Sequence, residues 1–328
     1  MATQWLKSVV VSEFHEGQAG FSQPRVTKNQ VDTLLQYSAD SIQFAFSVFE
    51  GMRVFVNGDK FLVFRSHDHH QRLLQSCKVM GLASPSIEIF LRAIEIAVRQ
   101  NAKDADQCLY IRPVVFATSG GIMAKERDGC TLTVLCANFE SRKRDLALLV
   151  ETDHPRTVPA FATIKTATNY ANSSLRTQAA QATGYDSVLW LDQDRVIQEC
   201  TTMNIFFWID GNINTPSLGG ILPGITRKTM IQLLAAEGHT VIERDVSLDE
   251  IVGCLDQRQP ISIFTTSTAL GVNTVTELCY MGKTYSLPDP APPAVLNAAK
   301  TYQAITRSFA NNLSRHPEIA GQSTIYDL

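Results

Sequence analysis

Three short segments in the second half of the chain constrain its fold and chemistry more than any other feature. Residues 164–170 contain Lys165, residues 198–204 contain Glu199, and residues 222–227 read Leu-Pro-Gly-Ile-Thr-Arg. A Pro-Gly turn before a helix exposes backbone N–H groups and the positive end of the helix dipole, which suits a phosphate. An amine, a carboxylate and an anion-binding turn are the groups that pyridoxal phosphate needs from a protein. The three segments together therefore favour a site for this cofactor.

Each of these residues also has a purely structural interpretation. A single lysine in a loop is usually exposed, and a glutamate at the end of a strand is usually solvated. The Pro-Gly-x-Thr sequence is also a common turn and helix start. Tyr170 fits either a hydrogen bond to the ring oxygen of the cofactor or a place in the core. The functional interpretation depends on the combination, because no single residue is specific.

Composition limits the class of protein. The chain has 328 residues, 45% of them hydrophobic, which is enough for a large core and favours two domains. A net charge of -3 gives no basic surface for nucleic acid. Seven scattered cysteines without a C-x-x-C pair fit free thiols in the cytoplasm better than disulfides or a zinc site. From the net charge we expect small-molecule partners. No window reaches the roughly 18 apolar residues of a membrane span, so we expect no membrane association.

The pattern of strands and helices indicates an α+β fold. In the first half, two strands flank Asn57-Gly58 as a hairpin, and a polar cap at Ser66 begins a helix that ends near Gly81. A charged break at residues 140–145 separates the domains, which we expect to span 1–141 and 142–328. The remaining predicted helices are 87–101, 172–183 and 226–237, and the remaining strands are 109–116, 131–136, 146–150, 187–191, 205–209 and 262–265.

Two apparent motifs carry no functional prediction. Residues 67–70 read His-Asp-His-His, but their spacing at a helix start splays the rings, so we expect a solvated helix terminus and no metal. Residues 119–121 read Ser-Gly-Gly, but no G-x-G-x-x-G or P-loop sequence accompanies them. Neither a metal site nor a nucleotide site is therefore predicted.

Taken together, the motifs resemble the fold type IV pyridoxal-phosphate enzymes, and most closely the branched-chain amino acid aminotransferases. The resemblance runs from about Phe44 to Val275. The segments that carry it are 47–53, 64–65 with 71–73, 110–113, Lys165 with 169–170, Glu199 with 203–204, 222–227 and 267–269. It implies a smaller N-terminal α/β sandwich, a larger C-terminal pseudo-barrel domain that binds the cofactor, and a homodimer.

The resemblance also implies a role for individual residues. Lys165 corresponds to the catalytic lysine that forms the Schiff base, Glu199 to the partner of the pyridine nitrogen, and Tyr170 to the partner of the ring oxygen. The implied phosphate ligands are Arg65, Ile225, Thr226 and Thr268. The implied substrate-binding residues are Phe44, Phe49, Gly51, Tyr110, Arg112 and Ala269.

The activity implied is transamination of an L-amino acid with an apolar side chain, namely leucine, isoleucine or valine, with 2-oxoglutarate as the amino acceptor. A D-amino acid or (R)-amine transaminase, an aminodeoxychorismate lyase and a noncatalytic cofactor-binding protein are the alternatives. The chain departs from the family pattern at Phe44, where a tyrosine is usual, and in the loop 118–125, which lacks the usual glycine-rich character. These changes affect which substrate the enzyme is expected to use, because related enzymes differ in their pocket residues while they keep the cofactor site.

Overall fold

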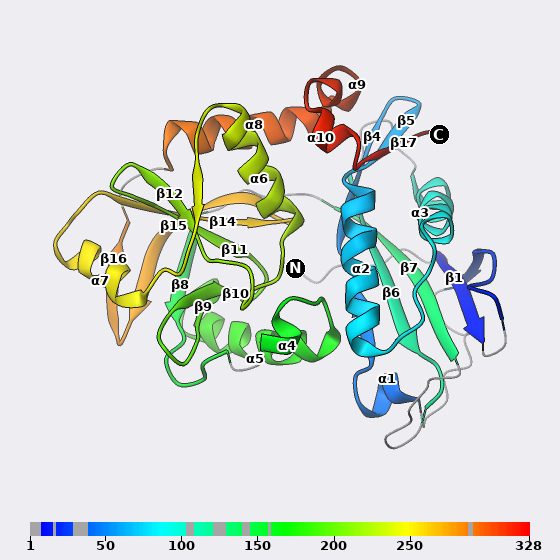
Figure 1. Cartoon of the computed structure of the whole chain (residues 1–328), viewed down its shortest axis with the longest axis horizontal. Helices are drawn as coiled ribbons and strands as arrows, with labels where there is room; N and C mark the ends of the chain where they lie inside the picture. Colours follow the sequence, from blue (N-terminus) through cyan, green and yellow to red (C-terminus); the bar gives the residue numbers. More distant parts are fainter. Residues whose placement is uncertain are drawn as a thin grey trace. The chain divides into compact units, whose positions relative to one another are not determined.

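The computed structural model describes residues 8–15, 18–28, 39–102, 108–120, 129–139, 145–156, 159–287 and 291–328. The chain forms two compact units, which Figure 1 shows in sequence colours. The first unit comprises Met1–Glu140, Ile164–Thr168 and Ala304–Leu328, and the second comprises Ser141–Thr163 and Asn169–Gln303. The first unit is thus built from three pieces of chain, whereas we expected two continuous domains. The boundary between residues 141 and 142 stays a prediction.

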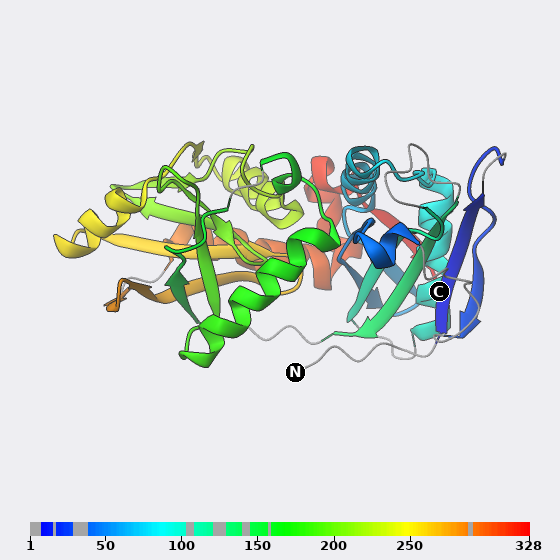
Figure 2. The ribbon, with the colours of Figure 1, turned by 90° about the horizontal axis from the view of Figure 1, so that it is seen from below.

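The first unit is built on an eight-stranded sheet with the order β17-β5-β4-β6-β7-β1-β2, and β3 pairs with β6 beside β4. Its pairs are antiparallel, and Figure 2 shows β1 and β2, in dark blue, at one edge. The strands are β1 (Ser8–His15), β2 (Arg25–Lys28), β3 (Ser47–Phe49), β4 (Met52–Asn57), β5 (Lys60–Val63), β6 (Cys108–Ala117), β7 (Gly129–Asn138) and β17 (Thr324–Asp327).

Helices of the first unit cover this sheet. Helix α3 contacts β1 and β7, helix α2 contacts β3, and the two helices contact each other. The predicted helix 87–101 is confirmed, and Ser86 caps it by accepting a hydrogen bond from the N–H of Ile89. The helices are α1 (Asp40–Gln43), α2 (Ser66–Met80), α3 (Ile87–Asn101), α9 (Phe309–Asn312), the 3-10 helix η1 (Leu313–Arg315) and α10 (Pro317–Ala320).

The local details of two predictions in this unit are wrong. The hairpin forms, but Asn57 pairs with Lys60, so the turn is Gly58-Asp59, one residue later than expected. Glycine suits that turn because Gly58 has a φ of 58°. Helix α2 ends at the predicted Gly81, but the N-cap residue is Arg65, and Ser66 is the first helical residue. Ser66 is instead buried and hydrogen-bonded to Thr324.

The second unit is built on a nine-stranded mixed sheet with the order β10-β9-β8-β15-β14-β11-β12-β13, and β16 pairs with β15. Strand β8 is parallel to both of its neighbours, β9 and β15. The strands are β8 (Leu146–Val150), β9 (Ser187–Leu191), β10 (Ile197–Cys200), β11 (Asn204–Ile209), β12 (Asn212–Thr215), β13 (Val241–Glu243), β14 (Ile261–Ser267), β15 (Gly271–Tyr280) and β16 (Lys283–Ser286).

The core of the second unit lies between this sheet and its helices. Buried side chains from β8, β9, β11, β14 and β15 pack with Leu248, Ile251 and Cys254 of α7. Helix α5 begins five residues before the predicted helix 172–183. The helices are α4 (Pro159–Ala162), α5 (Ala167–Ala182), α6 (Ile225–Ala236), α7 (Leu248–Asp256) and α8 (Pro293–Arg307).

The two sheets with their helices confirm the predicted α+β class. All seven cysteines are free thiols in the structure, as predicted, and six of them are buried. In the part of the chain that the structure describes, no helix combines the length and the apolar character needed to cross a bilayer. Most of the predicted loop 118–125 lies outside the described residues.

Candidate cofactor and substrate site

The segment that carries Lys165 is held by its backbone against β3 and α2 of the first unit. The N–H of Phe49 donates to the Lys165 carbonyl at 2.9 Å, and the N–H of Lys165 donates to Ser76 Oγ at 3.1 Å. Thr166 pairs with Val48 as an isolated bridge, and its hydroxyl donates to the Ser47 carbonyl at 2.9 Å. These bonds fix the direction of the Lys165 side chain, although the residue lies outside any strand.

Four predicted substrate residues form a cluster in the first unit, and one of them, Phe49, lies beside the Lys165 side chain. Lys165 Nζ lies 5.1 Å from the centroid of the Phe49 ring, and Arg112 Cζ lies 5.0 Å from the same centroid. Arg112 Nη2 donates to Tyr110 Oη at 3.2 Å. A Cβ at Gly51 would overlap Tyr110 Oη, so only glycine leaves room for that ring. The structure therefore gathers an amine, a guanidinium, a phenol and an apolar ring in one place.

A buried charge network fixes the turn that follows β3. The Glu50 carboxylate is fully buried, and it accepts hydrogen bonds from Arg72 Nε at 2.8 Å and Nη2 at 2.6 Å and from His69 Nδ1 at 2.7 Å. Burial raises the pKa of Glu50, but the charge and hydrogen bonds of Arg72 and His69 outweigh it and lower the pKa to about 2. Burial lowers the pKa of His69. Because Glu50 is adjacent to both Phe49 and Gly51, this network holds two of the predicted substrate residues in place.

Arg65, a predicted phosphate ligand, lies where β5 ends and α2 begins. Its side chain is fully buried, and Nε donates to Asp68 Oδ2 at 2.6 Å. Its backbone is left-handed, with a φ of 49°, which is uncommon for a residue with a side chain. The predicted Phe44 lies at the end of α1 and is 48% exposed. The phosphate-binding role of Arg65 and the substrate-binding role of Phe44 stay predictions.

In the second unit, Glu199 is a buried carboxylate rather than a solvated one. It is 6% exposed and lies at an irregularity of β10, where the register with β9 shifts between Ile197 and Cys200. A bulge of this kind re-aims a side chain. One carboxylate oxygen forms an ion pair with Arg156, and the other accepts from Asn204 Nδ2 at 2.9 Å and the Leu222 N–H at 3.2 Å. These donors stabilise the ionised carboxylate.

Asn204 connects Glu199 to the Pro-Gly turn before α6. Its Nδ2 also donates to the Leu222 carbonyl at 3.0 Å, and a Cβ at Gly224 would overlap its Oδ1. Gly224 is the N-cap of α6 and has no side chain that could cap the helix. The N–H groups of the first helical turn therefore point outward from the turn, with the buried hydroxyl of Thr226 beside them. This arrangement is what the binding of an anion requires.

The remaining predicted residues of the second unit lie at the ends of neighbouring elements. Thr268 and Ala269 form the tip of the hairpin between β14 and β15, and β14 pairs Thr266 with Asn204. Tyr170 lies in the first turns of α5. Helix α5 is tied to the end of β10, because Thr177 Oγ1 donates to Thr201 Oγ1 at 2.9 Å. The unit thus brings the neighbourhoods of Glu199, Thr226 and Thr268 to one end of its sheet.

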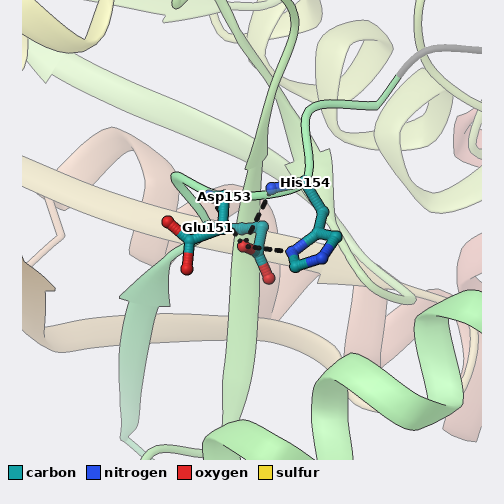
Figure 3. Close-up of side chains that lie close together, drawn as sticks. All are labelled: Glu151, Asp153 and His154. Atoms are coloured by element: carbon teal, nitrogen blue, oxygen red, sulfur yellow. Dashed lines mark hydrogen bonds and ion pairs between the residues drawn. The ribbon is translucent and has the colours of Figure 1, made fainter.

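Two clusters of possible metal ligands have other partners. The predicted solvated terminus at residues 67–70 is wrong, because His69 and His70 are buried, with His70 Nε2 2.9 Å from the Pro85 carbonyl. In the second unit, Glu151, Asp153 and His154 lie close together at a turn (Figure 3). Glu151 there accepts from the backbone N–H groups of Asp153 and His154, and Arg176 balances its charge at 3.6 Å. The structure explains both clusters without an ion.

Several residues that support the site carried no usable signal in the sequence. Ser76 holds the backbone of Lys165, and Arg156 holds Glu199. Both partners are distant in the sequence, so no local pattern connects them. Asn204 could have been found, since it follows Glu199 by five residues and begins a strand, and a polar side chain that begins a buried strand needs a buried partner.

Comparisons with known proteins agree with this geometry. The profile of the family described as "Amino-transferase class IV" matches residues 47–278. The branched-chain-amino-acid transaminase 1 of Bacillus subtilis is 33% identical over 295 residues, which cover 85% of this chain and 82% of that protein. The chain belongs to the class IV aminotransferase family.

Solved structures show the same fold. The branched-chain aminotransferase of Thermoproteus uzoniensis, crystallised with norvaline, has a TM-score of 0.78 and 26% identity over 96% of this chain and 99% of that chain. The branched-chain amino acid aminotransferase of Thermobaculum terrenum, crystallised in its PLP form, has a TM-score of 0.76 and 23% identity over 96% of this chain and 97% of that chain. The second likeness shows the fold alone.

Pyridoxal 5'-phosphate is the cofactor of this family, and the residues present fit it. Gly224 begins α6 without a capping side chain, so the first-turn N–H groups suit a phosphate. Glu199 is a buried, ion-paired carboxylate that can accept a further hydrogen bond, as a pyridinium nitrogen requires. Lys165 has the primary amine that a bond to the cofactor aldehyde requires.

Proposed function

We propose that this enzyme transfers the amino group of leucine, isoleucine or valine to 2-oxoglutarate. The observation that carries the proposal is the cluster of the first unit, where Lys165 Nζ and Arg112 both lie close to one apolar ring, Phe49. A branched-chain substrate needs an apolar surface beside the group that removes its proton and a cation for its carboxylate. The 33% identity to a branched-chain transaminase over 85% of the chain supports the same substrate class.

The cofactor residues have distinct roles in the proposal. Pyridoxal phosphate, when bound, supplies an aldehyde that captures the substrate amine and a ring that accepts electrons. Lys165 holds the cofactor before the substrate arrives, takes the proton from the substrate Cα and later returns it. Glu199 keeps the ring nitrogen protonated, and Tyr170 binds the ring oxygen. The phosphate is bound by Arg65, Ile225, Thr226 and Thr268.

The substrate residues divide into two groups in the proposal. Phe49 and Gly51 contact the apolar side chain, with Phe44 at its edge. Tyr110, Arg112 and the backbone of Thr268 and Ala269 bind carboxylates, and Arg112 binds the second carboxylate of glutamate or 2-oxoglutarate. A guanidinium suits this role because it binds a carboxylate through two parallel hydrogen bonds.

We further infer that the enzyme is a cytoplasmic homodimer. Helix α5 supports the dimer, because Leu175 is 66% exposed and lies on an exposed helical stripe with Ala171, Ala179 and Ala182. An apolar stripe on a two-faced helix is typical of an interface with a second copy. Seven free thiols favour a reducing compartment.

The lysine variant tests the role of Lys165. Lys165→Ala is expected to lose the visible absorbance of the lysine-bound cofactor and to lower the rate of transamination by about 10³-fold or more, because a positioned general base contributes roughly 10²–10⁴-fold. Lys300→Ala, an exposed lysine of α8, is the matched control and should keep both properties. Retention of the absorbance by Lys165→Ala would falsify the assignment.

A substrate panel tests the substrate class. The enzyme is mixed separately with L-leucine, D-alanine, an (R)-amine and aminodeoxychorismate, and the 2-oxo acid, ketone or pyruvate formed is measured. Rapid conversion of L-leucine with 2-oxoglutarate as acceptor supports the proposal. Preference for D-alanine or the amine would indicate the corresponding transaminase on the same fold, and pyruvate from aminodeoxychorismate would indicate the lyase. A protein that binds the cofactor but converts none of them would be noncatalytic.

A further inference from the structure

The backbone of Arg65 is held in an unfavourable conformation. Its φ of 49° and ψ of 40° are left-handed, and such a residue persists only when its surroundings hold it. Arg65 is also the N-cap of α2, so its backbone direction sets the direction in which its side chain leaves the sheet. The guanidinium at the other end is fixed by Asp68, whose Oδ2 accepts from Nε at 2.6 Å.

The residues that hold this turn come from the end of the chain. The N–H of Arg65 donates to Ser323 Oγ at 2.9 Å, and the N–H of His67 donates to the Gln322 carbonyl at 3.0 Å. Between them, Ser66 Oγ lies 2.7 Å from Thr324 Oγ1. The Ser66 hydroxyl also donates to the Gln322 carbonyl at 3.4 Å, so each residue of the turn 65–67 bonds to the segment 322–324.

Ser323 is itself positioned by the fold. Its hydroxyl donates to the carbonyl of Ile319 at 2.9 Å, which leaves its oxygen free to accept from the N–H of Arg65. The following strand β17 pairs with β5, with Thr324 opposite Val63, and Figure 1 shows the red strand beside β5. The segment 322–324 thus joins the sheet immediately beside the turn that it holds.

We propose that Ser323, together with β17, is a positioning element for the phosphate-binding guanidinium of Arg65. The inference rests on the proposed role of Arg65 as a phosphate ligand. The C-terminal segment does not touch the cofactor in this proposal. It acts through the backbone of Arg65, because a turn without the Ser323 acceptor would relax from the left-handed region and move the guanidinium.

The test compares two ligands of the apoenzyme, pyridoxal phosphate and pyridoxal, which lacks the phosphate. Ser323→Ala is expected to weaken the binding of pyridoxal phosphate about tenfold, which corresponds to the loss of roughly one hydrogen bond. It is expected to leave the binding of pyridoxal unchanged. Ser323→Thr keeps a hydroxyl and should recover most of the loss. Asp327→Asn, on the same strand with an 86% exposed side chain, is the matched control and should change neither affinity.

Arg65→Met separates this inference from the proposed function. If Arg65→Met leaves the ratio of the two affinities unchanged, the phosphate role of Arg65 is wrong and the inference fails with it. If Arg65→Met changes the ratio but Ser323→Ala does not, the inference alone is overturned. Support requires that the double variant Arg65→Met with Ser323→Ala binds pyridoxal phosphate no more weakly than Arg65→Met alone.

A second variant and a stability measurement distinguish a local effect on Arg65 from a general loss of structure. Ser66→Ala removes the contacts of this hydroxyl with Thr324 Oγ1 and the Gln322 carbonyl but keeps the Ser323 acceptor, so it should give a smaller shift of the same kind as Ser323→Ala. The melting temperature of each apoenzyme is measured in parallel. Equal losses of affinity for pyridoxal phosphate and for pyridoxal would show that the segment supports the whole unit rather than Arg65, and that result overturns the proposal.

Discussion

At the scale of single residues, the ion pair between Arg156 and Glu199 decides the charge of the carboxylate that faces the cofactor in our proposal. Glu199 is 6% exposed, so its ionised form needs partners. Asn204 and the Leu222 N–H bond one oxygen, and Arg156 pairs with the other. Arg156 is the only one of these three that carries a charge, so it contributes most to keeping the carboxylate ionised.

Arg156→Met is therefore expected to impair catalysis rather than folding alone. Without the guanidinium, Glu199 takes up a proton at higher pH, so the acid limb of the pH profile of kcat/KM should move to higher pH. We expect a loss of about tenfold in kcat/KM on the acid limb of the profile, the equivalent of a shift of roughly one pKa unit. The measurement is the pH dependence of steady-state rates.

Arg176→Met is the matched control for this prediction. Arg176 lies in the same unit and pairs with a different carboxylate, Glu151, at 3.6 Å. It should leave the pH profile unchanged. If the two variants have the same profile, Arg156 does not set the charge of Glu199.

At the scale of elements, the network of Glu50, His69 and Arg72 joins α2 to the turn between β3 and β4. Both Glu50 and His69 have pKa values below their usual ones in the folded enzyme, Glu50 at about 2. The unfolded chain therefore binds more protons than the folded chain as the pH falls. The stability that these groups provide is present above about pH 6.5. The part from His69 is lost as the pH falls below 6.5, and the part from Glu50 is lost as the pH falls from 4.5 to about 2.

We predict that the free energy of unfolding decreases by roughly 3 kcal/mol as Glu50 is titrated from neutral pH toward pH 2, since each pKa unit of difference corresponds to about 1.4 kcal/mol. Urea unfolding at several pH values measures this dependence. The double variant Glu50→Gln with Arg72→Met removes both charges without leaving one unpaired. Its stability should depend less on pH below 4.5, and an unchanged dependence would show that other groups are responsible.

At the scale of the whole molecule, the chain leaves each unit and returns to it. The segment Ile164–Thr168 belongs to the first unit although both neighbouring stretches belong to the second, and the last residues, Ala304–Leu328, complete the first sheet. The residues with predicted roles are thus divided between the units. In our proposal two chains form a dimer through the exposed stripe of helix α5.

Leu175→Arg is predicted to convert a dimer to monomers, because it places a charge in the middle of the exposed stripe of α5. Light scattering after size-exclusion chromatography measures the mass in solution. Met281→Arg is the control, since Met281 is 80% exposed at the turn between β15 and β16, on another part of the second unit. A dimer that persists in Leu175→Arg places the interface elsewhere, and a monomeric unmodified enzyme contradicts the dimer itself.

The bounds of several elements and the identity of the cofactor could be predicted from the amino-acid sequence alone. Helix α3 and strands β8 and β9 have the predicted bounds, because the period of apolar residues and a capping serine are local properties. Lys165, Glu199 and the Pro-Gly turn could be predicted as a group, because few cofactors need these residue types together. The family resemblance added the other site residues.

The distant residues that hold these groups could be identified only in the folded chain. Ser76 lies 89 residues before Lys165, and Ser323 lies 258 residues after Arg65, yet each bonds to the backbone of its partner. We predicted that His69 and His70 are solvated, but both are buried, where they form hydrogen bonds with Glu50 and with the Pro85 carbonyl. A sequence pattern reports local conformation and burial, whereas these contacts depend on the order in which strands join a sheet.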